Sequence, residues 1–542
     1  MAEPAAASGR PPLRLWPLWL LLFLAAAGVA AVRLDPGSTF QDRNLRSLLI
    51  GIVTSILVVL WWLLGSRARW KLRGLGFLAM LLAVGIGAGL FRIRGVSGDL
   101  LPILEPRWRT RPSLPGALTT AATSPSPASP QSAPARTGPP RPDFAQYLGP
   151  NRDTTVPGIA LNPDWAQHPP QVLWRIPVGS AWSGFVIVGE LALTQEQRDE
   201  EELVTCRNLT TGARVWEHSD VAKYDTVIAG TGPRQTPVVV GDRVYTMGAT
   251  GLVNCLDLAT GRRIWGTNIM DLAKRDAELK GGTPGQRTNI ARLPDWGYAG
   301  IPLVVDGRVI VQPGGDRGRS LAAFSAANGA LEWTAGDDSV DYSSPTLLTL
   351  GGVRQVLIFS SRKISAHDPT TGRILWQRPF GGQFPLVANP LAVGPDRVLL
   401  SAGYGVGAEL LEVNPGTNGA LAATSLWSSR RLKAKFHHPV RLGDYAYALD
   451  DGIWACLDLK DGSQPWKAGR YGHGQGLLVG KHYLLMAESG ELILLQPTPE
   501  APIELARFRI FDRKTWNPIA LAGDLLLVRN DQEAVLLKVA LQ

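Results

Sequence analysis

The sequence predicts an all-β protein, an eight-bladed β-propeller of four-stranded blades, preceded by three transmembrane α-helices. Three observations carry this prediction: apolar runs near the N-terminus, a Pro-rich stretch after them, and a glycine-and-tryptophan repeat that fills the rest of the chain. Because repeats dictate a whole fold, they fix the division of the chain. We expect a membrane anchor at 1–94, a disordered tether at 95–143 and the propeller at 144–542.

The predicted anchor contains three apolar runs, each free of charged residues, at 15–32, 48–64 and 74–91. Each is close to the roughly 20 residues that a helix needs to cross the hydrocarbon core. The first run also has features of a signal peptide, but its removal would not change the side on which the propeller lies. Positive residues flank both faces of the three helices, so their count does not decide the orientation.

The net charge of +9 is concentrated in the predicted anchor and tether. Residues 1–143 hold 16 Lys and Arg against 6 Asp and Glu, which leaves 39 against 40 in 144–542. Excess positive charge beside apolar helices indicates membrane flanks, and a nearly neutral propeller argues against a nucleic-acid partner. Residues 106–142 are rich in Pro, Ser, Ala and Thr, a composition that cannot bury enough apolar surface to fold.

The repeat consists of a strand, a Thr-Gly or Asn-Gly turn and a strand that carries tryptophan. It reads CLDLATGRRIW at 255–265 and AHDPTTGRILW at 366–376. Glycine supplies the positive φ of a tight turn, and the preceding Asp or Asn hydrogen-bonds the turn backbone. Two further β-rich runs separate successive copies, which gives four short strands per unit. Three copies carry a cysteine at the same position, which we interpret as a buried packing residue rather than a reactive thiol.

The spacing of the repeat tryptophans matches the period of propeller blades. The intervals from Trp174 to Trp466 are 42, 49, 68, 43, 51 and 39 residues, and the long one contains an insertion near 270–296. Trp174 has no preceding strands of its own, whereas 517–541 offers three strands without an outer one. We therefore expect the two ends of the chain to share a blade, which removes exposed sheet edges.

These repeats resemble the pyrroloquinoline-quinone repeat, most cleanly at 366–376. The resemblance implies a quinoprotein-like propeller on the periplasmic side of a bacterial inner membrane. The same repeats build quinoprotein dehydrogenases and a cofactor-free lipoprotein of outer-membrane assembly, so they leave open whether the chain is an enzyme. Our first hypothesis is a tethered propeller that binds a small molecule or an envelope protein at its channel mouth. The alternatives are a diverged dehydrogenase, with pyrroloquinoline quinone and Ca²⁺, that passes electrons to membrane quinone, and an envelope scaffold.

Loops entering the innermost strands converge on one mouth of a propeller, so polar and aromatic residues there are site candidates. Asp341 is the candidate catalytic base, and Glu196, in a predicted acidic loop, is a candidate metal ligand. In a structural interpretation the same side chains hydrate the channel and cap strand ends. The candidate cofactor- or ligand-binding residues are Trp182, Arg234, Tyr342, Asn389, His438 and His473.

Overall fold

The computed structural model describes residues 13–35, 37–108, 141–272, 293–315, 319–360, 362–382, 384–416 and 419–542. It divides into two compact units, Met1–Thr110 and Arg111–Gln542. Most of the predicted tether and of the insertion near 270–296 lies outside the described residues.

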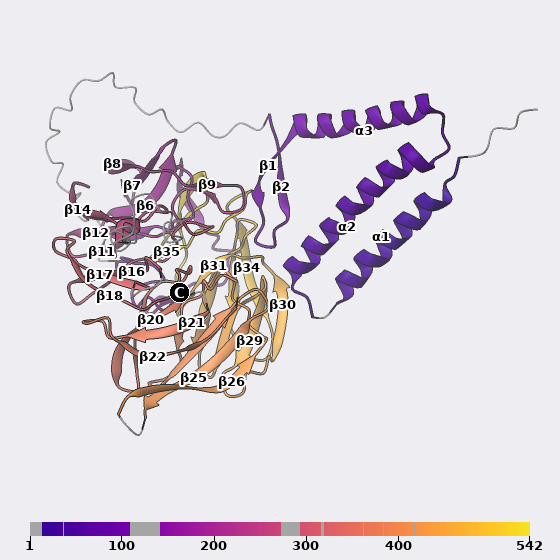
Figure 1. Ribbon diagram of the computed structural model, residues 1–542. Helices are drawn as coiled ribbons and strands as arrows, with labels where there is room; N and C mark the ends of the chain where they lie inside the picture. The colour runs from indigo at the N-terminus through magenta and orange to yellow at the C-terminus, as the bar shows by residue number, and fades with distance from the viewer. Residues whose placement is uncertain are drawn as a thin grey trace, which may run out of the picture. The chain divides into compact units, whose positions relative to one another are not determined.

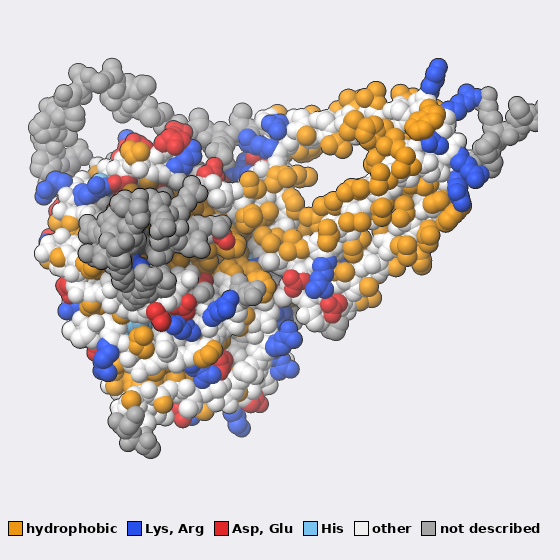
Figure 2. Space-filling view, in the orientation of Figure 1, with side chains coloured by type: hydrophobic (Ala, Val, Ile, Leu, Met, Phe, Trp, Pro, Cys, Tyr) orange, Lys and Arg blue, Asp and Glu red, His pale blue; other side chains and the backbone are white. Residues whose placement is uncertain are grey.

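The first unit contains three helices that are long and apolar enough to span a membrane. They are α1 (Trp16–Leu34), α2 (Phe40–Leu60), which continues as one π-helical turn, η1 (Trp61–Gly65), and α3 (Trp70–Leu90). Hydrophobic side chains cover them in the space-filling view (Figure 2). The second helix begins eight residues before the predicted run because Thr39 and Asp42 form a capping box at its start. The three predicted helices are therefore confirmed.

A β-hairpin follows the third helix, in the part of the chain where we expected the tether to begin. Its strands are β1 (Phe91–Val96) and β2 (Pro102–Pro106), and an ion pair of 2.9 Å joins Arg92 to Glu105 across them. The first residues of the predicted tether are thus ordered as part of the N-terminal unit.

The second unit is a ring of eight four-stranded blades (Figure 1). Each blade is given from its innermost to its outermost strand. Blade 1 consists of β5 (Val186–Val188), β6 (Leu191–Arg198), β7 (Glu201–Asn208) and β8 (Arg214–Val221), and blade 2 of β11 (Val238–Val240), β12 (Arg243–Met247), β13 (Leu252–Asp257) and β14 (Arg263–Asn268). Blade 3 consists of β15 (Leu303–Val305), β16 (Arg308–Val311), β17 (Leu321–Ser325) and β18 (Leu331–Ala335), and blade 4 of β19 (Thr346–Leu350), β20 (Val353–Ser360), β21 (Lys363–His367) and β22 (Ile374–Pro379). Blade 5 consists of β23 (Leu391–Ala392), β24 (Arg397–Ala402), β25 (Gly407–Pro415) and β26 (Leu421–Ser429), and blade 6 of β27 (Val440–Leu442), β28 (Tyr445–Asp450), β29 (Ile453–Asp458) and β30 (Trp466–Arg470). Blade 7 consists of β31 (Gln475–Val479), β32 (His482–Met486), β33 (Glu491–Gln496) and β34 (Ile503–Arg509), and blade 8 of β35 (Ala520–Ala522), β36 (Leu525–Arg529), β37 (Glu533–Lys538) and β4 (Gln171–Pro177).

The predicted closure of the ring is confirmed in blade 8. Its outer strand, β4, comes from the start of the propeller and pairs antiparallel with β37, so that Trp174 lies opposite Leu536. The short hairpin of β9 (Asp225–Thr226) and β10 (Gly230–Thr231) lies between blades 1 and 2 in the sequence. In each blade the outermost strand has one strand partner, so its other edge is free at the outside of the ring.

Five of the seven repeat tryptophans from Trp174 to Trp466 pack on the glycine turn of the next blade. Gly261 has a φ of +70°, and a Cβ placed on it would lie 2.3 Å from the ring of Trp216. The indole Nε1 of Trp216 donates to the carbonyl of Leu258 in the same turn at 2.9 Å. Tryptophan and glycine therefore form one contact between neighbouring blades, which explains why the two recur together.

A segment before the first outer strand lies across the central channel, and we call residues 144–156 the inner segment. Its strand β3 (Thr155–Val156) pairs parallel with β31 of blade 7, and Phe144 forms a bridge with Ile187 of blade 1. The guanidinium of Arg152 donates to the carbonyls of Ile301 and Pro302, which precede the inner strand of blade 3, at 2.8 and 3.0 Å. Because blades 3 and 7 face each other in a ring of eight, the segment crosses the channel.

Candidate functional site

The loops that enter the innermost strands lie on the same face of the ring as the turns between second and third strands. This follows from the antiparallel pairing of four strands in each blade. We call this face the channel mouth. Of the predicted site residues, all except Glu196 belong to these loops, so the structure places them on one face.

Polar side chains at the mouth join every pair of neighbouring blades, and we call these bonds the polar circuit. Asn389 shows the pattern: its Oδ1 accepts from the backbone N–H of Ser344 at 3.0 Å, and its backbone N–H donates to Nδ1 of His438 at 2.8 Å. Moving around the ring from blade 1, the joined pairs are Gly184 with Thr236, Gln235 with Tyr298, Ile301 with Ser344, Ser344 with Asn389, Asn389 with His438, Phe436 with Gln475, Glu488 with Trp516, and Asn517 with Ala181 and Ser183.

The contacts of His438 fix its tautomer. Because Nδ1 accepts a backbone N–H, the proton of the neutral ring lies on Nε2, which is 2.6 Å from the hydroxyl of Tyr147. Burial and, to a smaller extent, the nearby Arg152 lower the pKa of His438 to about 3. The ring is therefore neutral at ordinary pH and holds the inner segment to blades 5 and 6. This geometry supports the structural interpretation for Asn389 and His438.

Aromatic side chains from blades 5 to 8 and blade 1 form two contacting groups at the mouth, a pair in blade 5 and four rings in the other blades, which together we call the aromatic rim. Ring centroids are 5.0 Å apart between Trp182 and Trp516, and 5.2 Å apart between Trp516 and Phe436. Phe436 also contacts His473 at 5.3 Å. These separations are within the range of favourable aromatic pairs. The rim consists of Trp182, Phe384, Tyr404, Phe436, His473 and Trp516.

Two lysines lie over the rings of the aromatic rim. The ammonium of Lys514 is 3.8 Å from the ring centroid of Trp516 and 4.7 Å from that of Trp182. The ammonium of Lys435 is 4.6 Å from the ring centroid of Tyr404, which stacks on Phe384 at 5.5 Å. Cation–π contacts of this kind orient an ammonium without removing its charge. The rim therefore packs its flat aromatic faces against two lysine side chains, of which Lys435 is buried.

Arg234 and Trp182 converge on one backbone carbonyl. Nη2 of Arg234 and Nε1 of Trp182 donate to the carbonyl of Ala229 at 2.6 and 2.8 Å. The guanidinium also donates to the carbonyl of Gly232 at 2.7 Å and lies over the ring of Tyr224. Burial lowers the pKa of Arg234 to about 10, although Tyr224 and a nearby carboxylate oppose the shift. Arg234 thus braces the loop that enters blade 2.

Asp341 braces the loop that enters blade 5. Its carboxylate accepts from the amides of Leu386 and Tyr342 at 2.8 and 3.0 Å. These bonds favour the charged form, but burial outweighs them and raises the pKa of Asp341 to about 7. The ring of Tyr342 meets that of Trp296 edge-on at 5.4 Å, on the side of the mouth opposite Trp516. Glu202, which sequence reasoning did not select, is similarly buried, and burial raises its pKa to about 7.

Glu196 lies on strand β6, not in the acidic loop in which we expected it. Strand β6 ends at Arg198 and strand β7 begins at Glu201, so only Asp199 and Glu200 connect them. The carboxylate of Glu196 is fully buried, accepts from the amide of Gly179 at 2.8 Å and pairs with Arg198. Nor do the described parts of the chain contain any group of three His, Cys, Asp or Glu side chains that could hold a metal ion.

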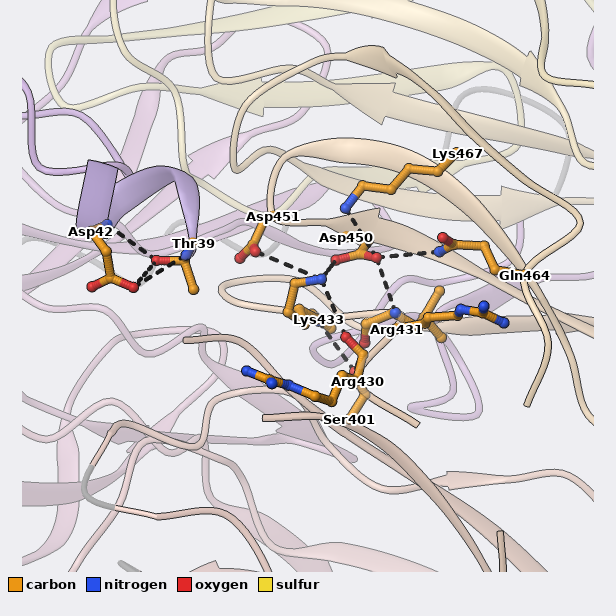
Figure 3. A network of polar contacts seen from close by, with 12 residues as sticks. Thr39, Asp42, Ser401, Arg430, Arg431, Lys433, Asp450, Asp451, Gln464 and Lys467 are labelled. Atoms are coloured by element: carbon orange, nitrogen blue, oxygen red, sulfur yellow. Dashed lines mark hydrogen bonds and ion pairs between the residues drawn. The ribbon is translucent and has the colours of Figure 1, made fainter. Parts of the chain in front are cut away.

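Buried charges also cross-link the loop that enters blade 6 (Figure 3). Asp450 forms ion pairs with Lys433 and Lys467, with oxygen–nitrogen distances of 2.6 and 3.1 Å, and accepts from the backbone N–H of Leu432. Burial raises the pKa of Asp450, but the two lysines outweigh it, so the pKa lies below its ordinary value. This network fixes the loop that carries Lys435 and Phe436.

Sequence reasoning missed most of the aromatic rim. Phe436 lies two residues before the predicted His438, and Trp516 lies in the loop that enters blade 8. The missed signal is that the loops entering consecutive blades carry aromatic residues at their ends. Phe384 and Tyr404 carry no such signal, because no repeat position marks them.

Comparison with known proteins identifies the repeat type. A family model described as outer membrane protein assembly factor BamB matches residues 200–468. Two curated relatives bear the same name. The one from Burkholderia pseudomallei is 31% identical over 30% of this chain and 46% of its own length. The one from Bordetella pertussis is 27% identical over 52% of this chain and 80% of its own length. The chain thus spans about half the length of the first of these relatives.

Solved structures with similar architecture include two kinds of propeller. BamB from Moraxella catarrhalis is 14% identical, with a TM-score of 0.46, over 68% of this chain and 97% of its own. Quinohemoprotein alcohol dehydrogenase from Comamonas testosteroni is 12% identical, with a TM-score of 0.42, over 74% of this chain and 81% of its own.

Proposed function

We propose that this membrane-anchored β-propeller of the pyrroloquinoline-quinone repeat type binds a protein partner of the bacterial envelope at its channel mouth. The observation that carries the proposal is the aromatic rim with its two lysines. Its rings are half-buried, apart from the buried His473 and the exposed Phe384, so they offer apolar faces without collapsing into the core. Tryptophan, tyrosine and other aromatic residues dominate the energetics of protein interfaces.

The polar circuit supports this proposal because it holds the rim in place before a partner arrives. Phe436 accepts from Gln475 through its backbone, and Trp516 donates from Nε1 to Glu488 at 3.1 Å. Loops that are already fixed lose little conformational entropy on binding. The names of the curated relatives, which describe assembly factors, favour a protein partner over a small molecule. We further propose, from the resemblance of the repeats to those of periplasmic quinoproteins, that the anchor lies in the inner membrane and the propeller in the periplasm.

The dehydrogenase hypothesis fits the described residues poorly. A calcium-bound quinone needs several hard oxygen ligands, but Glu196 is bound by Arg198 and a backbone amide. Both Nη atoms of Arg234 already donate to backbone carbonyls, and the carboxylate of Asp341 is bound by two amides. We therefore derive no redox step. A rise in melting temperature on adding pyrroloquinoline quinone and Ca²⁺ would reverse this assignment.

The test places a photo-crosslinking amino acid at position 384 of the full chain in its native membrane. The control carries the same amino acid at position 331 on β18, because Phe384 and Leu331 are 49% and 48% exposed. We expect a discrete protein adduct from position 384 only, which disappears when Trp516→Ala is added. The same adduct from both positions, or none from position 384, would contradict the proposal. Unchanged melting temperatures would show that the variants are folded.

A further inference from the structure

The outer strands of the eight blades differ in how their free edges are protected. Natural sheets commonly guard an exposed edge with charged side chains or proline, which discourage another strand from pairing. Seven outer strands carry at least one charged residue, for example Arg263 on β14 and Glu332 on β18. The outer strand of blade 5, β26, has the sequence LAATSLWSS and contains neither a charged residue nor a proline.

Much of this unprotected edge is open. Strand β26 is nine residues long and ends its sheet, with β25 as its one strand partner among the described residues. Nη1 of Arg378 reaches the carbonyl of Ala423 at 3.4 Å, so the neighbouring blade covers the start of the strand. Beyond that point Thr424, Ser425 and Leu426 are exposed, as is Ser428.

A cavity of about 260 Å³ lies at the far end of the same strand. Apolar atoms of Phe380, Val406 and Ala408 line it together with Ser428 and Glu409. The carboxylate of Glu409 pairs with Arg378 at 2.7 Å, and Arg430 lines the cavity beyond the end of the strand. Phe380, Val406 and Ala408 leave room for an apolar side chain of moderate size.

We propose that residues 424–428 bind an extended segment of another polypeptide by strand addition. Main-chain hydrogen bonds along the free edge would supply affinity, and the cavity at its end would select one apolar side chain. Along 424–428 the segment should be uncharged and should alternate apolar and polar residues, because this part of the edge offers no charge to pair and Arg430 lies beyond it. A second β26, paired antiparallel about Leu426, would present small residues near 422–424 to the cavity and leave it unfilled.

The test uses a fluorescent peptide of about ten residues that alternates valine and threonine, added to the full chain in detergent micelles. Leu426→Lys is compared with Ile264→Lys, because both residues immediately precede the repeat tryptophan and are 43% and 39% exposed. Strand β14 already carries Arg263, so its edge is guarded in the native chain. We expect saturable binding, weakened at least about tenfold by Leu426→Lys and unchanged by Ile264→Lys.

A peptide N-methylated at alternate residues supplies a second readout, because it keeps the side chains but cannot form the ladder. We expect this peptide to lose binding. Equal binding of both peptides, equal weakening by both lysine variants, or no saturable binding would overturn the proposal. A dimer of the native chain in sedimentation that Leu426→Lys dissociates would also overturn it, in favour of pairing between copies. If Leu426→Lys leaves the crosslinked adduct from position 384 unchanged, binding at the edge of β26 and binding at the channel mouth are independent.

Discussion

Replacing Asp450 by alanine should destabilise the propeller more than the loss of any surface ion pair. The Asp450 side chain is 1% exposed, and Lys433 and Lys467, which pair with it, are 16% and 26% exposed. Removing one member of a buried pair typically costs about 3–5 kcal/mol, and we take the lower end because water reaches the lysines. Unfolding entropy for about 400 residues is roughly 0.8 kcal/mol per kelvin, so the melting temperature should fall by about 4 °C.

The assay is thermal unfolding followed by tryptophan fluorescence, with Asp337→Ala as the control. Asp337 is 68% exposed and pairs with Lys363, so its removal should change the melting temperature by less than about 1 °C. Asp450 has a lower pKa in the folded state than in the unfolded chain, so its contribution is complete above the unfolded value of about 3.9. The difference between variant and native chain should therefore shrink as the pH falls through about 4. Equal effects of the two substitutions would refute the reasoning.

Three further predictions concern single side chains. Gly261→Ala should lower the melting temperature more than Gly189→Ala: both glycines have positive φ, but only the first would bring a Cβ against a tryptophan ring. The His438 imidazole, with a pKa of about 3, should show no titration in nitrogen-edited NMR spectra between pH 5 and 8, and its proton should remain on Nε2. Asp341 has a pKa raised to about 7 in the folded state, so its unfolded form releases its proton first and stability falls as the pH rises from about 4 to 7. Asp341→Asn should remove part of this fall in melting temperature, and an unchanged pH profile would contradict the assigned shift.

The sequence predicts the blades well because each one is specified locally. Trp216 and Gly261 show why: the residue that packs and the residue that makes room for it occur at fixed places in every clear repeat. The shared blade follows from the same repeat, since only an outer strand is missing at one end and present at the other. The apolar helices are equally local, because length and composition suffice to identify them.

The site could be predicted only in part because its contacts join residues distant in sequence. Tyr147 and His438 are 291 residues apart, and no periodicity connects them. Loop position placed Trp182, Arg234, Asn389 and His438 on one face, but it could not show that backbone groups occupy most of their polar atoms. The charged run around Glu196 suggested a loop, whereas pairing between β6 and β7 continues through it.

The inner segment also constrains the order in which the chain can fold. Residues 144–156 are synthesised before any blade, yet β3 pairs with β31 of blade 7, which is made near the end. Strand β4 likewise cannot pair until β37 has been synthesised, because β37 is its only strand partner in the described structure. Contacts of such long sequence separation slow folding, because the ends of a large loop must meet before they are stabilised. A ribosome-bound chain that lacks blade 8 should therefore remain open to proteases at β4, and the ring should become resistant only after release of the complete chain.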